Sequence, residues 1–399
     1  MDTQAADMPA SARRRLADRV RLKDAHIITR MADIAEGLPD VIRLGRGDPD
    51  LDTPAHIVKA GQEALGNGAT HYTHPLGIPA LRQAIADNIA AYGGAHYDPS
   101  QIVVTPGGQH AMFVIALGLL NPGDEILVPC PGYNPYHQAA EMAGAETVHI
   151  RTSIATNFCV TAEMVEAHVT PRSRILVLIN PNNPTGTVTP PAEVVRIAEV
   201  ARKHDLIVIS DEIYARLTYS NHTVQPVAAL PGMAERTITL SGFSKAYAMT
   251  GWRIGYFAAP ADLVPALAEI NHAFAISTAA VSQHAALAAL TSPQDCVEEM
   301  RRTYDRRRRQ LMAGLDSLGI PYAEPQGAFY VYANVASTGV GGAEFCERLL
   351  REGQVMMYPG SIYGDYTDDF VRMSLTTDRI PEAMSRMGAV VDRIRRDAA

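Results

Sequence analysis

The chain has 399 residues, of which 47% are apolar and 20% charged, and its formal net charge is −8. This length accommodates one large domain and a smaller one, and the composition is ordinary for a soluble globular protein. The acidic balance offers no basic surface for nucleic acid or for an anionic membrane.

The cysteines and the apolar runs bear on where the protein is found. The sequence predicts neither a disulfide framework nor a zinc site, because the cysteines lie far apart and form no Cys-x-x-Cys pair: Cys130, Cys159, Cys296 and Cys346. The first dozen residues are polar, unlike a secretory signal. The longest apolar run, 111–120, is too short to span a bilayer. We therefore expect a cytoplasmic protein.

The first hundred residues predict helices separated by loops rich in glycine and proline. In chain order we expect a disordered tail at 1–12, a charged helix at 13–36, a strand at 41–44, a loop at 45–54, a helix at 55–66, a loop at 70–79 that contains Tyr72, and a helix at 80–92. A glycine-rich loop such as 45–54 can bring a backbone N–H close to a ligand.

From about residue 100 the sequence alternates strand, loop and helix. The predicted strands are apolar runs at 102–105, 126–128, 175–179, 206–209, 237–240, 254–257, 329–332 and 370–374. Helices are predicted at 111–120, 191–204 and 261–290. This alternation favours an α/β fold with a mostly parallel sheet, whose ligands lie beyond the carboxyl ends of the strands.

Five of the predicted strands run into residues that can bind a ligand: Gly108, Tyr133, Asn183, Asp211 and Lys245. The Gly-Gly turn that precedes the helix at 111–120 offers free N–H groups and the positive end of a helix dipole, which suit a phosphate. The ring of Tyr133 can stack on a planar ligand, although a tyrosine that packs a proline-rich turn is equally typical. Two prolines flank Asn182 and Asn183, which indicates fixed amide donors.

Lys245 stands out among the lysines. The others, Lys23, Lys59 and Lys203, lie among polar and charged neighbours in helical patterns, as solvated lysines do. Lys245 instead follows a buried strand and is surrounded by small and aromatic residues. An amine in such a place can lose enough hydration to act as a nucleophile or Schiff-base former. An isolated Ser-Lys pair would more often be a chance loop feature, so the assignment depends on the other strand ends.

Three further features of the sequence carry charge: an aspartate, an arginine and an arginine-rich run. Asp211 directly follows a buried apolar strand, where ionisation requires a facing cation. Arg372 lies inside an apolar strand, where a guanidinium requires a carboxylate or a phosphate. The arginine-rich run at 301–310 favours a solvated helix face over nucleic-acid binding, since one run does not make a surface.

A planar, phosphorylated aldehyde satisfies these requirements together. At these residues the chain resembles the fold-type I, pyridoxal-phosphate-dependent aminotransferases of classes I and II. The resemblance extends from about Val41 to Met387 and includes three specific motifs, Asn180-Pro-Asn-Asn-Pro-Thr-Gly186, Ser210-Asp-Glu-Ile-Tyr214 and Ser244-Lys-Ala-Tyr-Ala-Met-Thr-Gly-Trp-Arg253. It implies an aminotransferase that moves the amino group of an L-amino acid to a 2-oxo acid.

The resemblance also implies a role for each site residue. Lys245 resembles the lysine that forms the Schiff base and then moves the proton at Cα, and Asp211 the partner of the pyridine nitrogen. The cofactor's other contacts would come from Tyr214 and Asn183 at the phenolic oxygen, Tyr133 stacked on the ring, and Gly108, Gln109, Ser244 and Arg253 at the phosphate. Tyr72 matches the tyrosine that reaches the neighbouring subunit's phosphate, which implies a homodimer with shared sites.

For the substrate, Arg372 resembles the arginine that binds the α-carboxylate, helped by Asn183 and the N–H of Gly47. One departure concerns the phosphate site. Gly242 stands where some relatives carry a serine, three residues before the lysine, and whether Ser241 compensates stays open. We expect the small domain to combine 13–54 with 301–399, the large cofactor domain to span 55–300, and no metal to take part.

Relatives that prefer aspartate commonly bind its second carboxylate with an arginine of the other subunit, from the segment after the Gly-Trp-Arg motif. Residues 254–300 contain no arginine or lysine, and 271–277 is apolar and aromatic with His272 as its one possible cation. We therefore expect neutral or aromatic amino donors, with Arg46 as the residue that could still serve an acidic substrate. The alternatives are an aspartate-type aminotransferase, a pyridoxal-phosphate β-lyase and, least favoured, a non-catalytic regulator that binds the cofactor.

Overall fold

The computed structural model describes residues 15, 17 and 25–397, and it divides them into two compact units. The larger unit comprises Asp48–Arg306 and Ala323–Tyr330, and the smaller unit comprises the described residues up to Gly47, Arg307–Tyr322 and the described residues from Val331 onward. The sequence analysis divided the chain after residues 54 and 300, whereas these units divide after Gly47 and Arg306 and place Ala323–Tyr330 in the larger unit. The tail expected at 1–12 lies outside the described residues.

The larger unit alternates strands with helices. Its strands are β2 (Ile102–Thr105), β3 (Glu125–Cys130), β4 (Glu146–Arg151), β5 (Ser173–Ile179), β6 (Ile207–Asp211), β7 (Thr237–Gly242) and β8 (Gly255–Ala258). Its helices are α4 (Ala55–Gly66), α5 (Pro79–Ala91), α6 (Gly108–Leu119), α7 (Pro135–Ala143), α8 (Ala162–His168), α9 (Pro191–Lys203), α10 (Val264–Ala275) and α11 (Ala280–Thr291). The helix α12 (Asp295–Leu318) crosses the division after Arg306.

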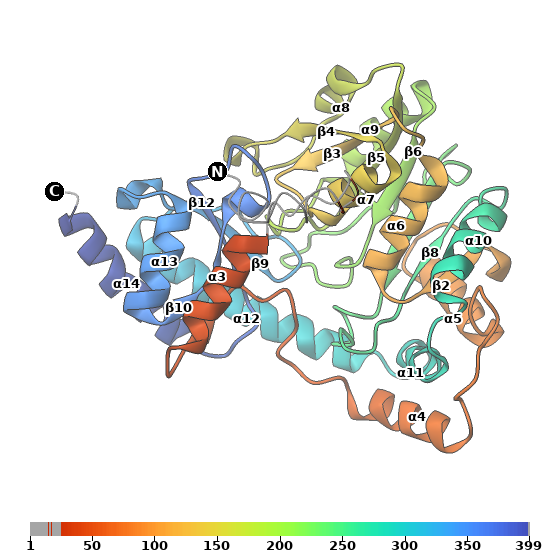
Figure 1. The fold of residues 1–399 in the computed structure, drawn as a ribbon, viewed down its shortest axis with the longest axis horizontal. Helices are drawn as coiled ribbons and strands as arrows, with labels where there is room; N and C mark the ends of the chain where they lie inside the picture. Colours follow the sequence, from red (N-terminus) through yellow and green to blue (C-terminus); the bar gives the residue numbers. More distant parts are fainter. Residues whose placement is uncertain (1–14, 16, 18–24, 398–399) are drawn as a thin grey trace. The chain divides into compact units, whose positions relative to one another are not determined.

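The strands of the larger unit form one sheet of seven in the order β2-β8-β7-β6-β5-β3-β4 (Figure 1). Only β8 runs antiparallel to its neighbours β2 and β7, and the remaining pairs are parallel. The predicted α/β fold with a mostly parallel sheet is therefore confirmed. The edge strand β4 is the one strand of this sheet that the sequence analysis did not predict.

Helices cover both faces of this sheet, and β5 shows why its sequence is apolar throughout. Ile175 and Val177 pack on one face, in a core shared with α6 and α7, while Leu176 and Leu178 pack on the other face, in a core shared with α8 and α9. Side chains alternate across a strand, so a strand buried on both faces needs apolar residues at every position.

The single helix expected at 261–290 is two helices, α10 and α11. α10 ends where Ile276 adopts φ 58°, and the N–H of Ile276 donates to the carbonyl oxygen of His272. A positive φ is rare for a β-branched residue. Residues 271–280, around the break, contain no glycine or proline, so the sequence carries no conventional signal for it.

The smaller unit contains helices α3 (Ala25–Glu36), α13 (Gly342–Gly353) and α14 (Ile380–Asp397), together with the short strands β1 (Ile42–Arg43), β10 (Val355–Met356) and β11 (Tyr358–Pro359), and β12 (Phe370–Ser374). The strand β9 (Tyr330–Asn334) begins at the last residue of the larger unit. β1 pairs with β10, and β11, β12 and β9 form a three-stranded sheet. Among the described residues, no helix combines the length and the apolar character that crossing a bilayer requires.

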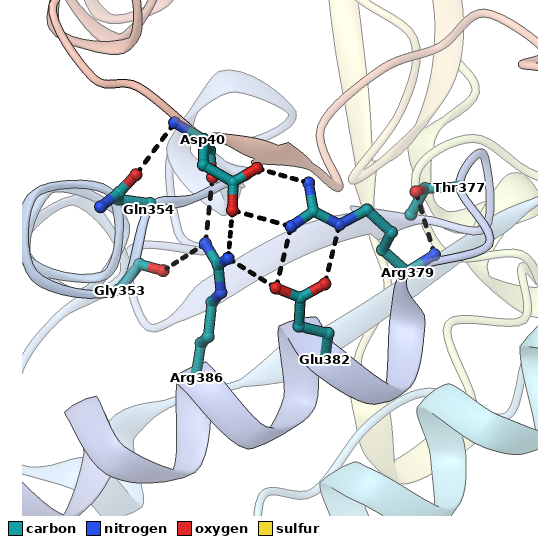
Figure 2. A network of polar contacts seen from close by, with 7 residues as sticks. All are labelled: Asp40, Gly353, Gln354, Thr377, Arg379, Glu382 and Arg386. Atoms are coloured by element: carbon teal, nitrogen blue, oxygen red, sulfur yellow. Dashed lines mark hydrogen bonds and ion pairs between the residues drawn. The ribbon is translucent and has the colours of Figure 1, made fainter.

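A network of charged side chains connects the two ends of the smaller unit (Figure 2). The carboxylate of Asp40, just before β1, accepts hydrogen bonds of 2.8 and 2.9 Å from Arg379 and a further bond from Arg386. Glu382, on α14, accepts from the same two arginines. The hydrogen bonds from Arg379 and Arg386 hold the pKa of Asp40 well below its usual range. The network therefore favours the ionised carboxylate.

We predict that Asp40→Asn lowers the unfolding temperature at pH 7, because the substitution removes the charge that two arginines share. A carboxylate with a lowered folded-state pKa contributes its full stability above its unfolded pKa of about 3.9 and loses it as the pH falls further. The difference from wild type, measured by calorimetry, should therefore shrink below about pH 4. High salt should reduce it as well.

The control is Asp205→Asn, which removes a single exposed ion pair with Arg236. An isolated exposed pair contributes little to stability. The account of the network is wrong if Asp205→Asn costs as much as Asp40→Asn, or if the Asp40→Asn difference is the same at pH 3 and pH 7.

Candidate functional site

The sheet of the larger unit brings distant parts of the sequence to one edge. The strands β2, β3, β5, β6 and β7 all run in the same direction, because β8 is antiparallel to both β2 and β7. Their carboxyl ends therefore share one edge of the sheet. The residues singled out from the sequence, Gly108, Tyr133, Asn183, Asp211 and Lys245, all end or follow these strands.

Aromatic rings surround the amine of Lys245. Its Nζ lies 6.0 Å from the ring centroid of Tyr214 and 5.7 Å from that of Phe329. The hydroxyl groups of Tyr214 and Tyr330 lie 3.0 Å apart. Phe329 and Tyr330 come from the short return 323–330, which the sequence analysis did not assign to the larger unit. The two rings therefore place apolar surface near the amine, which favours a reactive lysine.

Asp211, at the end of β6, is almost fully buried, with 2% of its surface exposed. Its Oδ2 accepts a hydrogen bond of 2.8 Å from the hydroxyl of Tyr136, and its Oδ1 accepts one of 3.2 Å from the N–H of Ile213. Burial raises the pKa of Asp211 to about 6, although both hydrogen bonds and the positive charge of Lys245 act in the opposite direction. A cation placed beside this carboxylate would favour its ionised form.

Sequence reasoning missed Tyr136. It singled out Tyr133, three residues earlier, and assigned no role to Tyr136. The signal that could have found it is the buried acid itself, since an acid that ends a buried strand requires hydrogen-bond donors. The sequence does not show which element supplies such a donor.

The amino end of α6 forms a cradle for an anion. Gly107 caps the helix at φ 89°, and a Cβ added there would lie 2.6 Å from Nη2 of Arg253. A Cβ added at Gly255 would lie 2.7 Å from the backbone nitrogen of Gly108. The glycines thus let a guanidinium approach the free N–H groups of the helix. The side chain of Gln109 accepts a hydrogen bond of 3.3 Å from the hydroxyl of Tyr133, which places that ring beside the same helix end.

The remaining residues predicted for the larger unit's site occupy different environments. Asn183 and Ser244 are buried, whereas Tyr72 is 77% exposed. At Gly242, a Cβ would lie 2.9 Å from the Cα of Gly255, so a serine there would require the backbone to shift. The hydroxyl of the preceding Ser241 donates to the carbonyl oxygen of Glu212 at 3.3 Å.

Two predicted substrate-binding residues, Gly47 and Arg372, belong to the smaller unit. Arg372 lies on β12 and is 6% exposed. Its Nη2 donates to the carbonyl oxygen of Gly45 at 2.8 Å, and its guanidinium lies 4.8 Å from the ring centroid of Tyr363. A backbone carbonyl and an aromatic face thus both contact the Arg372 side chain.

The donors at the sheet edge fit a planar, phosphorylated aldehyde. The cradle of Gly107, Gly108 and Arg253 suits its phosphate, the Asp211 carboxylate suits a protonated ring nitrogen, and the Lys245 amine suits an aldehyde carbon. By contrast, no group of three or more His, Cys, Asp or Glu side chains is arranged to hold a metal ion in the part of the chain that the structure describes.

Comparison with known proteins identifies the family. Residues 39–387 match the family model described as aminotransferase class I and II. The chain is 38% identical to aromatic-amino-acid aminotransferase 2 of Thermococcus litoralis and 38% identical to aspartate aminotransferase of Pyrococcus abyssi, each over 94% of this chain and 98% of the relative. It is also similar to the structure of an aromatic aminotransferase from Pyrococcus horikoshii, with a TM-score of 0.87 and 37% identity over 92% of this chain and 100% of that one.

The family match, the similar proteins and the residues at the sheet edge indicate the same kind of enzyme. Most of the chain is covered, so the similarity concerns the whole enzyme rather than one motif. The chain belongs to the aminotransferase class I and II family and is a pyridoxal-phosphate-dependent amino-acid aminotransferase.

Proposed function

We propose that Lys245 and Asp211 are the central pair of the active site, and that Lys245 both binds the cofactor aldehyde and moves the proton at the substrate Cα. The single observation that carries the proposal is the placement of Lys245 beside Tyr214 and Phe329, where its charge also acts on the buried Asp211. Bound pyridoxal phosphate supplies a sink for the electron pair that remains when the Cα–H bond breaks.

Asp211 holds a proton on the ring nitrogen, because a buried carboxylate stabilises a facing cation. With the cofactor bound, Tyr214 and Asn183 would donate to its phenolic oxygen, and the ring of Tyr133 would stack on the pyridine. The N–H groups of Gly108 and Gln109, with Ser244 and Arg253, bind the phosphate at the amino end of α6. The cradle supports these phosphate contacts, since the glycines leave room for the guanidinium beside the helix.

Arg372 binds the α-carboxylate of the substrate in a bidentate geometry, aided by Asn183 and the N–H of Gly47. The support comes from the way Arg372 is held, with one nitrogen on the Gly45 carbonyl and its plane beside the ring of Tyr363. A guanidinium oriented in this way loses less conformational entropy when it binds a carboxylate.

The active form is a homodimer in which Tyr72 reaches the phosphate site of the second copy. Tyr72, Phe274 and Ile276 are large apolar side chains with 77%, 59% and 41% of their surface exposed. Their segments are joined, because the N–H of Thr73 donates to Oγ of Ser277 at 3.2 Å. A cluster of exposed apolar side chains favours an interface.

The preferred donors are neutral or aromatic amino acids. The only possible cation of 271–277 is His272, and its Nδ1 lies 3.1 Å from the carbonyl oxygen of Ile276. A second carboxylate buried against Phe274 and Ile276 would lose its hydration without gaining a partner. The names of the two relatives, one for aromatic amino acids and one for aspartate, do not decide between these substrates. We place the reaction in cytoplasmic amino-acid metabolism, including biosynthesis.

Lys245→Ala should lower kcat by about a hundredfold to ten-thousandfold, because the substitution removes the general base. In wild type, borohydride reduction followed by peptide mapping should place the cofactor on Lys245. Lys203→Ala is the matched control, since that lysine pairs with Glu166 on the surface. A label on Lys23, Lys59 or Lys203 would refute the assignment. Turnover that releases ammonia and needs no added 2-oxo acid as acceptor would instead favour the β-lyase alternative.

Gly107→Ala should weaken cofactor binding at least about tenfold, or about 1.4 kcal/mol, because its Cβ displaces Arg253 from the helix end. Gly68→Ala is the control, because Gly68 also has a positive φ, of 84°, but no neighbouring atom within 4 Å of the added Cβ. Equilibrium titration of the cofactor-free variants measures both affinities. Equal affinities would show that the glycine is needed for backbone conformation only.

The donor preference predicts that kcat/KM is higher for phenylalanine, methionine or alanine than for aspartate. Arg46→Ala tests whether this exposed arginine serves an acidic donor, and Arg174→Ala, which removes another exposed arginine, is the control. If aspartate is preferred by tenfold or more, about 1.4 kcal/mol, in both wild type and Arg46→Ala, the proposed preference is wrong.

A further inference from the structure

Tyr136 is a buried residue whose hydroxyl is directed at the acid of the site. It lies in the first turn of α7 and is 1% exposed, packed in the apolar core that α6 and α7 share with the sheet. Its hydroxyl donates to Oδ2 of Asp211 at 2.8 Å, while the N–H of Ile213 donates to Oδ1. Each carboxylate oxygen therefore has one donor, which fixes the plane of the group and leaves further lone pairs on both oxygens.

This hydrogen bond bears on the charge of Asp211 as well as on its orientation. A donor that faces a carboxylate stabilises the ionised form, and it does so most where water is excluded. The other titratable groups that act on this pair are Lys245, Tyr133 and the adjacent Glu212. Lys245 favours the ionised carboxylate, whereas burial opposes it and raises the pKa of Asp211 to about 6. Burial also raises the pKa of Tyr136, so the phenol keeps its proton and stays a donor.

We propose that Tyr136 is a positioning residue that keeps Asp211 ionised and oriented toward the ring nitrogen of the cofactor. The inference rests on the role proposed above for Asp211. Tyr136 itself touches neither substrate nor cofactor in this account, and it acts through the carboxylate. It thereby contributes to cofactor affinity and to the pH range in which the enzyme works.

A second buried tyrosine separates this role from simple packing. Tyr97 is 8% exposed, and its hydroxyl lies 3.1 Å from Oγ1 of Thr239, a neutral partner. Tyr97→Phe therefore removes a buried hydroxyl of the same kind without touching Asp211. Any effect common to both variants reports on packing, and any effect specific to Tyr136→Phe reports on the carboxylate.

The test compares wild type, Tyr136→Phe and Tyr97→Phe as full-length proteins. Carbon-13 NMR of aspartate-labelled, cofactor-free protein follows the Asp211 carboxyl through a pH titration, with its resonance assigned by its loss in Asp211→Asn. We expect Tyr136→Phe to move this titration upward by about one pH unit and Tyr97→Phe to leave it in place. In the loaded enzyme, cofactor affinity should fall about tenfold in Tyr136→Phe alone. The acid limb of kcat/KM should also move to higher pH in that variant.

If Tyr136→Phe does not fold, Tyr136→His replaces it, because an imidazole N–H also donates and should keep the wild-type titration. The inference is overturned if Asp211 titrates alike in wild type and Tyr136→Phe, or if Tyr97→Phe shifts it equally. These outcomes are independent of the role proposed for Asp211. If the titration moves but cofactor affinity does not, the hydrogen bond is real and the assignment of Asp211 to the ring nitrogen fails instead.

Discussion

The rest of the site depends on a carboxylate at the end of a strand that is buried on both faces. Water cannot reach Asp211, so its charge must be stabilised by neighbouring groups. The parallel sheet supplies them, because the ends of β3, β6 and β7 meet at one edge and lead to Tyr136, Asp211 and Lys245 in turn. A buried carboxylate between a phenol and an amine suits a cationic ring nitrogen, which a solvated carboxylate would hold far less firmly.

Close backbone contacts impose the second constraint. At Gly107, Gly242 and Gly255 an added Cβ would lie within 3 Å of a neighbouring atom. The close approach places the guanidinium of Arg253 beside the free N–H groups of α6, where positive charge and helix dipole act on one small volume. The close approach also accounts for the glycine at 242, where a Cβ would lie 2.9 Å from the Cα of Gly255.

Many of the helices and strands could be predicted from the local pattern of apolar residues in the sequence. The strands β2 and β12 and the helix α4 have the predicted bounds, because their apolar patterns and, for β2 and α4, a flanking proline define them. The edge strand β4 was missed, since its half-exposed residues lack an apolar run. The break between α10 and α11 was missed because a β-branched residue, Ile276, adopts the positive φ there.

The residues of the candidate site also divide into those that the sequence predicts and those that it does not. Residues that directly end or follow a strand, such as Asp211 and Lys245, could be identified from the sequence because the topology of parallel sheets fixes where they lie. Tyr136 and Phe329 could not, since their contacts depend on how a helix and a distant return segment pack against the sheet. Sequence patterns therefore located the residues at the strand ends better than the residues that contact them.

The most direct test of the account is the rate of a single half-reaction in Asp211→Ala loaded with cofactor. Stopped-flow absorbance, with α-deuterated and unlabelled donor, isolates the removal of the Cα proton. The account predicts that the cofactor still binds, that the rate falls by about a thousandfold or more, and that the isotope effect is large. A rate within tenfold of wild type, with cofactor bound, would contradict the claim that this carboxylate controls the chemistry.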